Sequence, residues 1–358
     1  MARKLRIQFP GALYHIVNRG DRSEPIVRDD TDRERFIETL AQACQKTGWR
    51  VDAYCLLTDH FHLVVQTPEP NLVDGMKWFL GTYTARFNRR HATGGHLFNG
   101  RYKSQVLDSG DLALRMQAID YLHLNPVRTG DVSEGNPLAS FRWSSFPSYL
   151  AGGGSRPGWL EVSHVLAHLQ EPDDSDGWKS LEARTEALRA EARAERWAIF
   201  RRGWYLGCDS FRRQLLDHLG GLRDDKSTGL VWRASAEQQA EKVIQRTLQH
   251  LGWQESDLTQ RAKTDREKVF IAREIRKETT LPLTWIAARL SMGSRNTLRN
   301  SLAFADRAPA ASASTSPFRS TQPPVKPRLP RPTRLPDLAP PPAAATSEQS
   351  FQVEPGWD

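Results

Sequence analysis

Residues 49–65 have the sequence WRVDAYCLLTDHFHLVV, which predicts two β-strands joined by a tight turn. The strands run from Trp49 to Leu57 and from Phe61 to Val65, because both segments are rich in β-branched, aromatic and other apolar residues. Thr58-Asp59 lies at the turn between them. This strand pair is the centre of the predicted fold.

The second strand carries two histidines that flank a phenylalanine. Side chains alternate in direction along a strand, so His60 and His62 leave one face of the sheet while Phe61 points into the core. Two imidazoles side by side on a sheet can share one divalent metal ion. The alternative is that they are ordinary polar residues on an exposed face. Asp59 is either an acceptor that orients an imidazole or simply a turn residue.

The segments on either side of this strand pair alternate between strand and helix patterns. They are a strand at 13–17, a helix at 33–46 ended by Gly48, a helix at 73–88, a strand at 102–107, and a helix at 112–124 that ends before Asn125-Pro126. The order strand, helix, strand, strand, helix, strand predicts an α+β fold with a ferredoxin-like antiparallel sheet and helices on one face.

Three regions differ in composition along the chain. The glycine-rich stretch Ala151–Ser155 predicts a boundary after a first domain at residues 1–150. Residues 158–305 are expected to form a second, all-α domain. Residues 306–358 are rich in Pro, Ala, Ser and Thr and are expected to be a disordered tail, because such segments bury little apolar surface.

A helix-turn-helix is predicted near residues 282–304. One helix covers Leu283–Leu290, a short turn contains Gly293, and Ser294 caps the next helix. In a helix-turn-helix the second helix enters the DNA groove, so Arg295, Asn296 and Arg299 are candidate DNA contacts. The alternative is a plain helical hairpin within a bundle.

The charge and cysteine content of the chain narrow the function classes. The 358 residues carry a net charge of +8, with an isoelectric point near 9.5, which favours nucleic acid as a partner. The three cysteines are scattered, which argues against disulfides and for the cytoplasm. No apolar run approaches the roughly 20 residues of a membrane span, so no membrane partner is expected.

Tyr121 and Asn125 lie four residues apart at the end of the predicted helix 112–124, hence on the same face. If that face meets the sheet, it brings a nucleophile and an oxygen ligand beside the two histidines. The alternative is that Tyr121 is a core aromatic. His123 is two residues from Tyr121 and is expected to be structural, or at most a DNA contact.

Several basic residues stand next to aromatic ones, a combination that suits single-stranded nucleic acid, in which phosphates meet cations and bases stack on rings. Taken singly, each is typical of a solvated helix end or strand edge. The candidates are Arg86, Arg89 and Arg90 near the end of the second helix, and Arg101, Tyr102 and Lys103 on the next strand.

Five blocks within residues ~5–150 resemble, in the same order, the REP-associated tyrosine transposases, which belong to the wider class of HUH single-strand transposases. The last block is expected to be a structural tryptophan that packs the end of the domain. The blocks are Tyr14–Gly20, Thr58–Leu63, Gly95–Lys103, Tyr121–Arg128 and Trp143–Phe146.

This resemblance implies that His60 and His62 are metal ligands, that Asn125 is the third ligand and that Tyr121 is the nucleophile. It implies Mg²⁺ or Mn²⁺, although the donor set by itself does not exclude Zn²⁺. It further implies a single-stranded or hairpin DNA substrate and a covalent 5′-phosphotyrosine intermediate. From the matching blocks, Arg19 and Arg128 are further candidate DNA contacts.

Two other functions fit the same residues. One is a DNA-binding regulator with the same fold and helix-turn-helix that no longer cuts DNA. The other is a replication-initiation or conjugative nickase, which shares the histidine pair but usually places the tyrosine differently. The sequence is compatible with a monomer that uses its own Tyr121 and with a homodimer that supplies it in trans. The chain departs from the family pattern at Ser23-Glu24-Pro25, where more basic residues are expected, and in its long tail.

Overall fold

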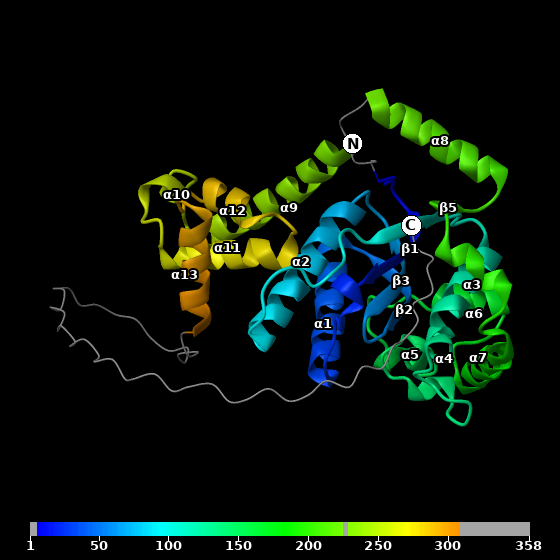
Figure 1. Cartoon of the computed structure of the whole chain (residues 1–358). Coiled ribbons are helices and arrows are strands. Elements are labelled where there is room, and N and C mark those ends of the chain that lie inside the picture. The colour runs from blue at the N-terminus through cyan, green and yellow to red at the C-terminus, as the bar shows by residue number, and fades with distance from the viewer. Residues whose placement is uncertain (1–5, 225–227, 308–358) are drawn as a thin grey trace, which may run out of the picture. The chain divides into compact units, whose positions relative to one another are not determined.

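The structure is a computed structural model that describes residues 6–224 and 228–307. Its first part is a mixed α+β unit built around a five-stranded sheet with the order β2-β3-β1-β4-β5 (Figure 1). The strands are β1 (Ala12–Arg19), β2 (Arg50–Leu56), β3 (His60–Thr67), β4 (Lys103–Leu107) and β5 (Tyr205–Leu206). The predicted tail lies outside the described residues, apart from its first two positions.

The first four strands and the first two helices follow the predicted order. β1 pairs antiparallel with β3 and β4, and β2 pairs antiparallel with β3. The helices are α1 (Asp30–Thr47) and α2 (Leu72–His91). β5 was not predicted: it contributes only two residues, which pair in parallel with the edge of β4, and so short a segment has no strand periodicity in the sequence.

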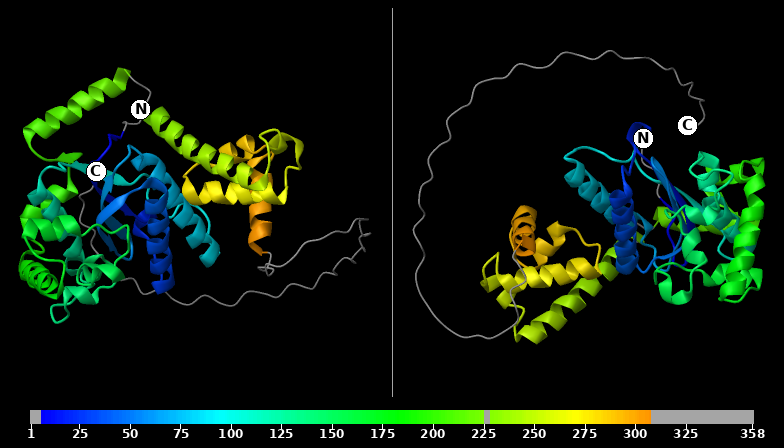
Figure 2. Two further views of the ribbon diagram at one scale, coloured as in Figure 1. Left: turned by 180° about the vertical axis from the view of Figure 1, so that it is seen from behind. Right: turned by 90° about the horizontal axis from the view of Figure 1, so that it is seen from below.

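Helices cover both faces of the sheet, which corrects the expectation of helices on one face (Figures 1 and 2). α1 and α2 cover the face of Phe61, whose ring lies 5.0 Å from that of Phe36 and 6.0 Å from that of Phe79. α3 (Leu112–His123) packs against β2 and β3 on the other face. Nearly every residue of β3 is buried, so both faces need a covering layer.

Local signals fix the ends of these helices. Asp29 caps α1, since its side chain accepts a hydrogen bond from the Asp32 amide at 3.0 Å. Gly48 ends the helix with φ 71°, a left-handed conformation that favours glycine. α3 ends at His123, and a short helix, α4 (Asn125–Thr129), starts with its proline in the first turn, where no amide hydrogen is needed. The predicted end of the third helix is thus confirmed.

The hydrophobic core does not end at the expected boundary near residue 150. The core of the first part also includes Val165, Leu181, Trp197, Phe200 and Leu215. These come from α6 (Ser163–Leu169), α7 (Ser175–Ala187), the 3₁₀ segment Glu195–Arg201 and α8 (Asp209–Asp224). The backbone of β2 is also tied to this region, because Val51 N donates to Trp159 O at 3.0 Å. The glycine-rich stretch marks a local turn and not the limit of the core.

The remaining short elements connect these helices. They are α5 (Phe146–Tyr149) and the 3₁₀ turns Asp21–Ser23, Leu138–Ser140, Gly153–Ser155 and Leu188–Glu191. In the part of the chain that the structure describes, every helix is too short or too polar to cross a lipid bilayer.

A second hydrophobic cluster holds the C-terminal helices together, and Ile244, Ile271, Ile286 and Leu298 lie at its centre. The helices are α9 (Thr228–Leu251), α10 (Asp257–Gln260), α11 (Arg266–Glu278), α12 (Leu283–Arg289) and α13 (Arg295–Arg307); α12 and the start of α13 agree with the prediction. Lys268 is fully buried, and its ammonium group donates to the carbonyl oxygens of Leu258 at 2.8 Å and Ser291 at 3.2 Å.

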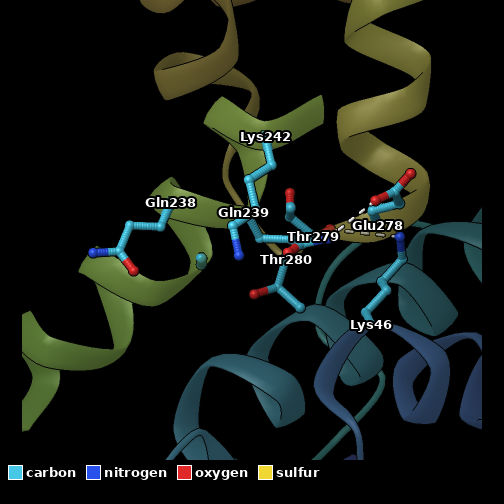
Figure 3. Close-up of a pocket in the computed structure, with 8 residues that line it drawn as sticks. Lys46, Gln238, Gln239, Lys242, Glu278, Thr279 and Thr280 are labelled. Atoms are coloured by element: carbon cyan, nitrogen blue, oxygen red, sulfur yellow. Dashed lines mark hydrogen bonds between the residues drawn. The ribbon is translucent and has the colours of Figure 1, made fainter. Parts of the chain in front are cut away.

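Polar side chains also join α9 to the end of α11. Figure 3 shows Gln239 and Lys242 of α9 beside Glu278 and Thr279. The amide nitrogen of Gln239 donates to Glu278 at 3.1 Å, and Arg246 forms an ion pair with the same carboxylate at 2.8 Å. Gln239, Lys242, Glu278 and Thr279 are among the residues that line a polar pocket here.

Candidate active site

His60 and His62 both leave the face of β3 that α3 covers. Their rings are 5.2 Å apart, at an angle of 77°. Both residues are buried, and each is less than a tenth exposed. The strand register places Arg19 opposite His60 and Val17 opposite His62, on the central strand β1.

Asp59 contacts the first of these histidines directly. His60 Nδ1 lies 2.5 Å from Asp59 Oδ1, and Arg19 Nε lies 3.5 Å from the other carboxylate oxygen. Burial alone raises the pKa of Asp59, but its hydrogen bond with His60 and the charges nearby hold that pKa below its ordinary value. Asp59 is therefore placed as the acceptor that orients His60, and it also occupies the turn between β2 and β3.

His15 is a third buried histidine at this site, and the sequence analysis assigned it no role. Its Nε2 lies 3.0 Å from His62 Nδ1, and the two rings lie edge to edge, with centroids 5.3 Å apart and planes 4° from parallel. Its Nδ1 lies 3.0 Å from Gln105 Oε1 on β4. Burial lowers the pKa of His15 to about 4 and holds the pKa of His62 well below 6.5. His15 lies in the block Tyr14–Gly20 that carries the family resemblance, but neither that block nor strand alternation on β1 specifies its neighbour.

Tyr121 lies against these histidines. Its ring meets His15 edge-on at 5.6 Å and His62 at 5.7 Å. On its other side it stacks on Phe200 at 5.0 Å, and Trp197 lies 6.3 Å away. Phe200 and Trp197 belong to the 3₁₀ segment Glu195–Arg201, which the sequence analysis assigned to another domain. The segment covers the tyrosine, and the residue is only 5% exposed.

Arg128 places a positive charge on the ring of Tyr121. Its guanidinium lies 3.9 Å from the ring centroid, and its Nη2 donates to the Tyr121 carbonyl oxygen at 2.6 Å. Its Nη1 is buried, and no hydrogen-bond partner for it lies in the part of the chain that the structure describes. Burial lowers the pKa of Arg128 to about 10, still well above neutrality. A half-buried cation with an unsatisfied donor suits an anionic ligand such as a phosphate.

Asn125 is buried at the start of α4, one helical turn after Tyr121. Its amide nitrogen has no hydrogen-bond partner within the described residues, so the group is free to turn toward a ligand. In the same residues, no cluster of three or more His, Cys, Asp or Glu side chains is placed to hold a metal. Two imidazoles and a carboxamide would be a different set of metal ligands. The role of Asn125 as the third ligand stays a prediction.

Two of the arginines predicted to contact DNA have partners within the protein. Arg86 donates to Thr39 Oγ1 at 2.6 Å and to Gln42 Oε1 at 2.9 Å. Arg90 forms ion pairs with Asp29 and Asp32, both at 2.6 Å. These contacts join α2 to α1 on the sheet face opposite Tyr121. Arg89, from the same group, is exposed.

The other predicted contacts differ in exposure. Arg101 and Lys103 are exposed, whereas Tyr102 is buried with Arg6 3.5 Å from its ring centroid. His123 donates to or accepts from Ser145 Oγ at 2.9 Å and packs on Phe146, as expected of a structural residue. Trp143 is buried, and its carbonyl oxygen accepts a hydrogen bond from Leu56 N at 2.9 Å.

The candidate residues on α13 are all exposed. Arg295, Asn296 and Arg299 face outward, while Leu298 and Leu302 of the same helix are buried in the second cluster. Ser294 Oγ accepts a hydrogen bond from Thr297 N at 3.2 Å, which caps the helix start.

Comparison with known proteins finds one matching family model. Residues 9–117 match the family model described as "Transposase IS200 like", a range that contains His15, His60 and His62 and ends before Tyr121. A solved structure of a REP-associated tyrosine transposase bound to a REP hairpin is similar at 16% identity and a TM-score of 0.35, over 45% of this chain and 92% of that chain. No curated protein matches the chain. The likeness to the IS200-like transposases therefore covers residues 9–117.

Proposed function

We propose that the protein is a metal-dependent endonuclease and strand transferase that cuts and rejoins single-stranded or hairpin DNA through Tyr121. The main support is the contact of Tyr121 with His15 and His62, on the sheet face that also carries His60. These residues belong to one chain, so we infer that the tyrosine acts with the histidines of its own subunit.

Mg²⁺ or Mn²⁺ would be held by His60, His62 and the amide oxygen of Asn125. The fit rests on two buried imidazoles side by side and on a buried carboxamide whose nitrogen is unpartnered. The ion supplies charge stabilisation for the phosphate under attack. Asp59 holds His60 in place from outside the ligand set.

The reaction forms one bond to phosphorus and breaks another. The phenolic oxygen of Tyr121 loses its proton and attacks the scissile phosphate, and the bond from phosphorus to the 3′ oxygen breaks. The 3′ oxygen takes up a proton and leaves as a hydroxyl, while the 5′ phosphate stays on Tyr121. Attack on this linkage by a 3′-hydroxyl, from the same or another strand, rejoins DNA without a nucleotide cofactor. Arg128 offsets negative charge beside the ring.

DNA binding is assigned to two regions. We interpret the antiparallel order β2-β3-β1-β4, with α1 and α2 on one face, as a ferredoxin-like arrangement in which α3 brings Tyr121 against the histidines of the other face. We interpret α12 and α13 as a helix-turn-helix that presents Arg295, Asn296 and Arg299 to duplex DNA, because these side chains are exposed at the start of a capped helix.

The test is a covalent adduct on a denaturing gel after incubation with hairpin oligonucleotides and Mn²⁺. We expect an adduct with the unmodified protein and with Tyr205→Phe, a tyrosine on β5 that serves as the matched control. Tyr121→Phe should bind the same DNA and form no adduct. An adduct with Tyr121→Phe refutes the assignment. Binding without any adduct in the unmodified protein favours the non-cleaving regulator.

A further inference from the structure

We propose that Gln105 and His15 form a hydrogen-bond relay that fixes the tautomer of His62. In this tautomer the Nε2 atom of His62 carries no proton. The inference deepens the proposed function, because it says which nitrogen of this ligand faces the metal. Its test, described below, is made first on the metal-free protein. The two ideas can therefore fail separately.

The relay starts at two backbone carbonyl groups. The amide nitrogen of Gln105 donates to the carbonyl oxygens of Ile199, at 3.1 Å, and of Arg202. A carbonyl oxygen only accepts hydrogen bonds, so the nitrogen of the Gln105 amide must face this segment. The amide oxygen then faces His15 Nδ1, at 3.0 Å. The orientation of Gln105 is thus set by its partners.

The proton positions follow along the chain of contacts. Because Gln105 Oε1 only accepts, His15 Nδ1 must carry the proton, and a neutral imidazole then has a bare Nε2. That bare nitrogen lies 3.0 Å from His62 Nδ1, which must donate to it. His62 consequently holds its single proton on Nδ1, and its Nε2 lone pair is left for a metal ion.

His60 reaches the same tautomer by a different route. Its Nδ1 donates directly to the carboxylate of Asp59, whose side chain is about a third exposed at the turn. His62 lies deeper, where a second carboxylate would be costly to desolvate. The neutral amide of Gln105, acting through the neutral imidazole of His15, keeps the proton of His62 on Nδ1 without burying a charge. Both Nε2 atoms are thereby free for one ion.

The relay also involves the segment that covers the nucleophile. Ile199 and Arg202, whose carbonyl oxygens orient Gln105, flank Phe200, which stacks on Tyr121. The position of this segment therefore affects both partners of the proposed reaction. Gln105 and His15 are positioning residues in this account, because they act on the site through His62.

The direct measurement is the ring ¹⁵N signature of His62 in the metal-free protein, assigned with His62→Gln. We expect the Nδ1-protonated form for the unmodified chain. Gln105→Leu removes the acceptor for His15, so a mixture of both tautomers is expected, and Mn²⁺ affinity measured by calorimetry should fall about 10- to 100-fold. Gln66→Leu is the matched control on β3: its amide donates to the Gly11 carbonyl oxygen outside the relay, and both readouts should be unchanged.

The outcomes separate the two ideas. A proton on Nε2 of His62 in the unmodified protein overturns the relay, even if Gln105→Leu fails to fold. A folded Gln105→Leu protein with unchanged tautomer and unchanged Mn²⁺ affinity also overturns it. The expected tautomer in a protein that binds no Mn²⁺ supports the relay and counts against the metal-dependent function.

Discussion

The ring of Phe200 stacks on the ring of Tyr121, with centroids 5.0 Å apart and 28° between the ring planes. Phe200 belongs to the 3₁₀ segment Glu195–Arg201, which also contributes Trp197 to the same surface of the tyrosine. The candidate nucleophile is therefore sandwiched between the histidine-bearing sheet and a segment far along the chain. Access of DNA to Tyr121 depends on that segment.

Phe200→Ala should increase the chemical accessibility of Tyr121. Loss of the stacked ring removes the cover on one side, so nitration of Tyr121 by tetranitromethane, followed by mass spectrometry, should be faster. The deletion should also lower the free energy of unfolding by about 3–5 kcal/mol, since Phe200 is part of the core. Phe211 belongs to the same core, and within the described residues its ring has no contact with the ring of Tyr121. Phe211→Ala should therefore destabilise the protein and leave the nitration rate of Tyr121 unchanged. Equal nitration rates in both variants would contradict this view of the cover.

Arg128→Gln should slow formation of the covalent adduct. The variant removes a half-buried cation 3.9 Å from the Tyr121 ring. A desolvated contact of this kind contributes about 1–2 kcal/mol, which corresponds to roughly a 5- to 30-fold change in rate. The measurement is single-turnover adduct formation with hairpin DNA. Arg142→Gln is the matched control, because Arg142 lies over Trp143 at the surface. The same rate in both variants would argue against a role of Arg128 at the phosphate.

Asp29 should make folding sensitive to acid. Its hydrogen bonds with Arg90, and then with the Asp32 amide, lower its pKa in the folded protein to about 2. The folded-state pKa lies below the ordinary value of 3.8, so the unfolded chain binds more protons between these two values. The stabilisation is present above pH 3.8 and is lost as the pH falls toward 2. Unfolding midpoints measured from pH 5 to pH 2 should fall less steeply for Asp29→Asn than for Asp217→Asn, at an exposed position on α8.

Arg184→Ala should destabilise the first core. Arg184 on α7 holds the buried carboxylate of Asp120 on α3 with two hydrogen bonds, at 2.8 Å and 2.7 Å. Removing Arg184 leaves that carboxylate unpaired and should lower the free energy of unfolding by about 3 kcal/mol. This value is at the low end of the usual range, because a third of the Arg184 side chain is exposed. Urea unfolding measures the change. Lys179→Ala, in an exposed ion pair on the same helix, should change stability by less than about 0.5 kcal/mol.

A further variant tests the cause of that loss. Asp120→Asn combined with Arg184→Ala removes the buried charge together with its partner, so it should be less destabilising than Arg184→Ala alone. A small effect of Arg184→Ala by itself would mean that α7 does not depend on this link to α3. The region after residue 150 would then be closer to the separate domain that its composition suggests.

The sequence by itself determined the local part of this architecture. Strand alternation put His60 and His62 on one face, Gly48 ended α1, and Pro126 limited α3. Each of these features depends on residues within one or two turns of one another, or on two or three strand positions. Such constraints of backbone geometry and periodicity act over a few residues, so a short segment of the sequence is enough to infer them.

Only the tertiary structure decided which of these residues meet. His15 contacts His62 across 47 positions because β1 pairs with β3 in one particular register. Phe200 reaches Tyr121 because the core continues past a glycine-rich turn, and Arg90 pairs with Asp29, which is 61 positions away in the sequence. Strand register, burial and ion pairing are chosen by the free energy of the whole packed chain. A residue's partners therefore depend on elements that its own neighbourhood in the sequence does not specify.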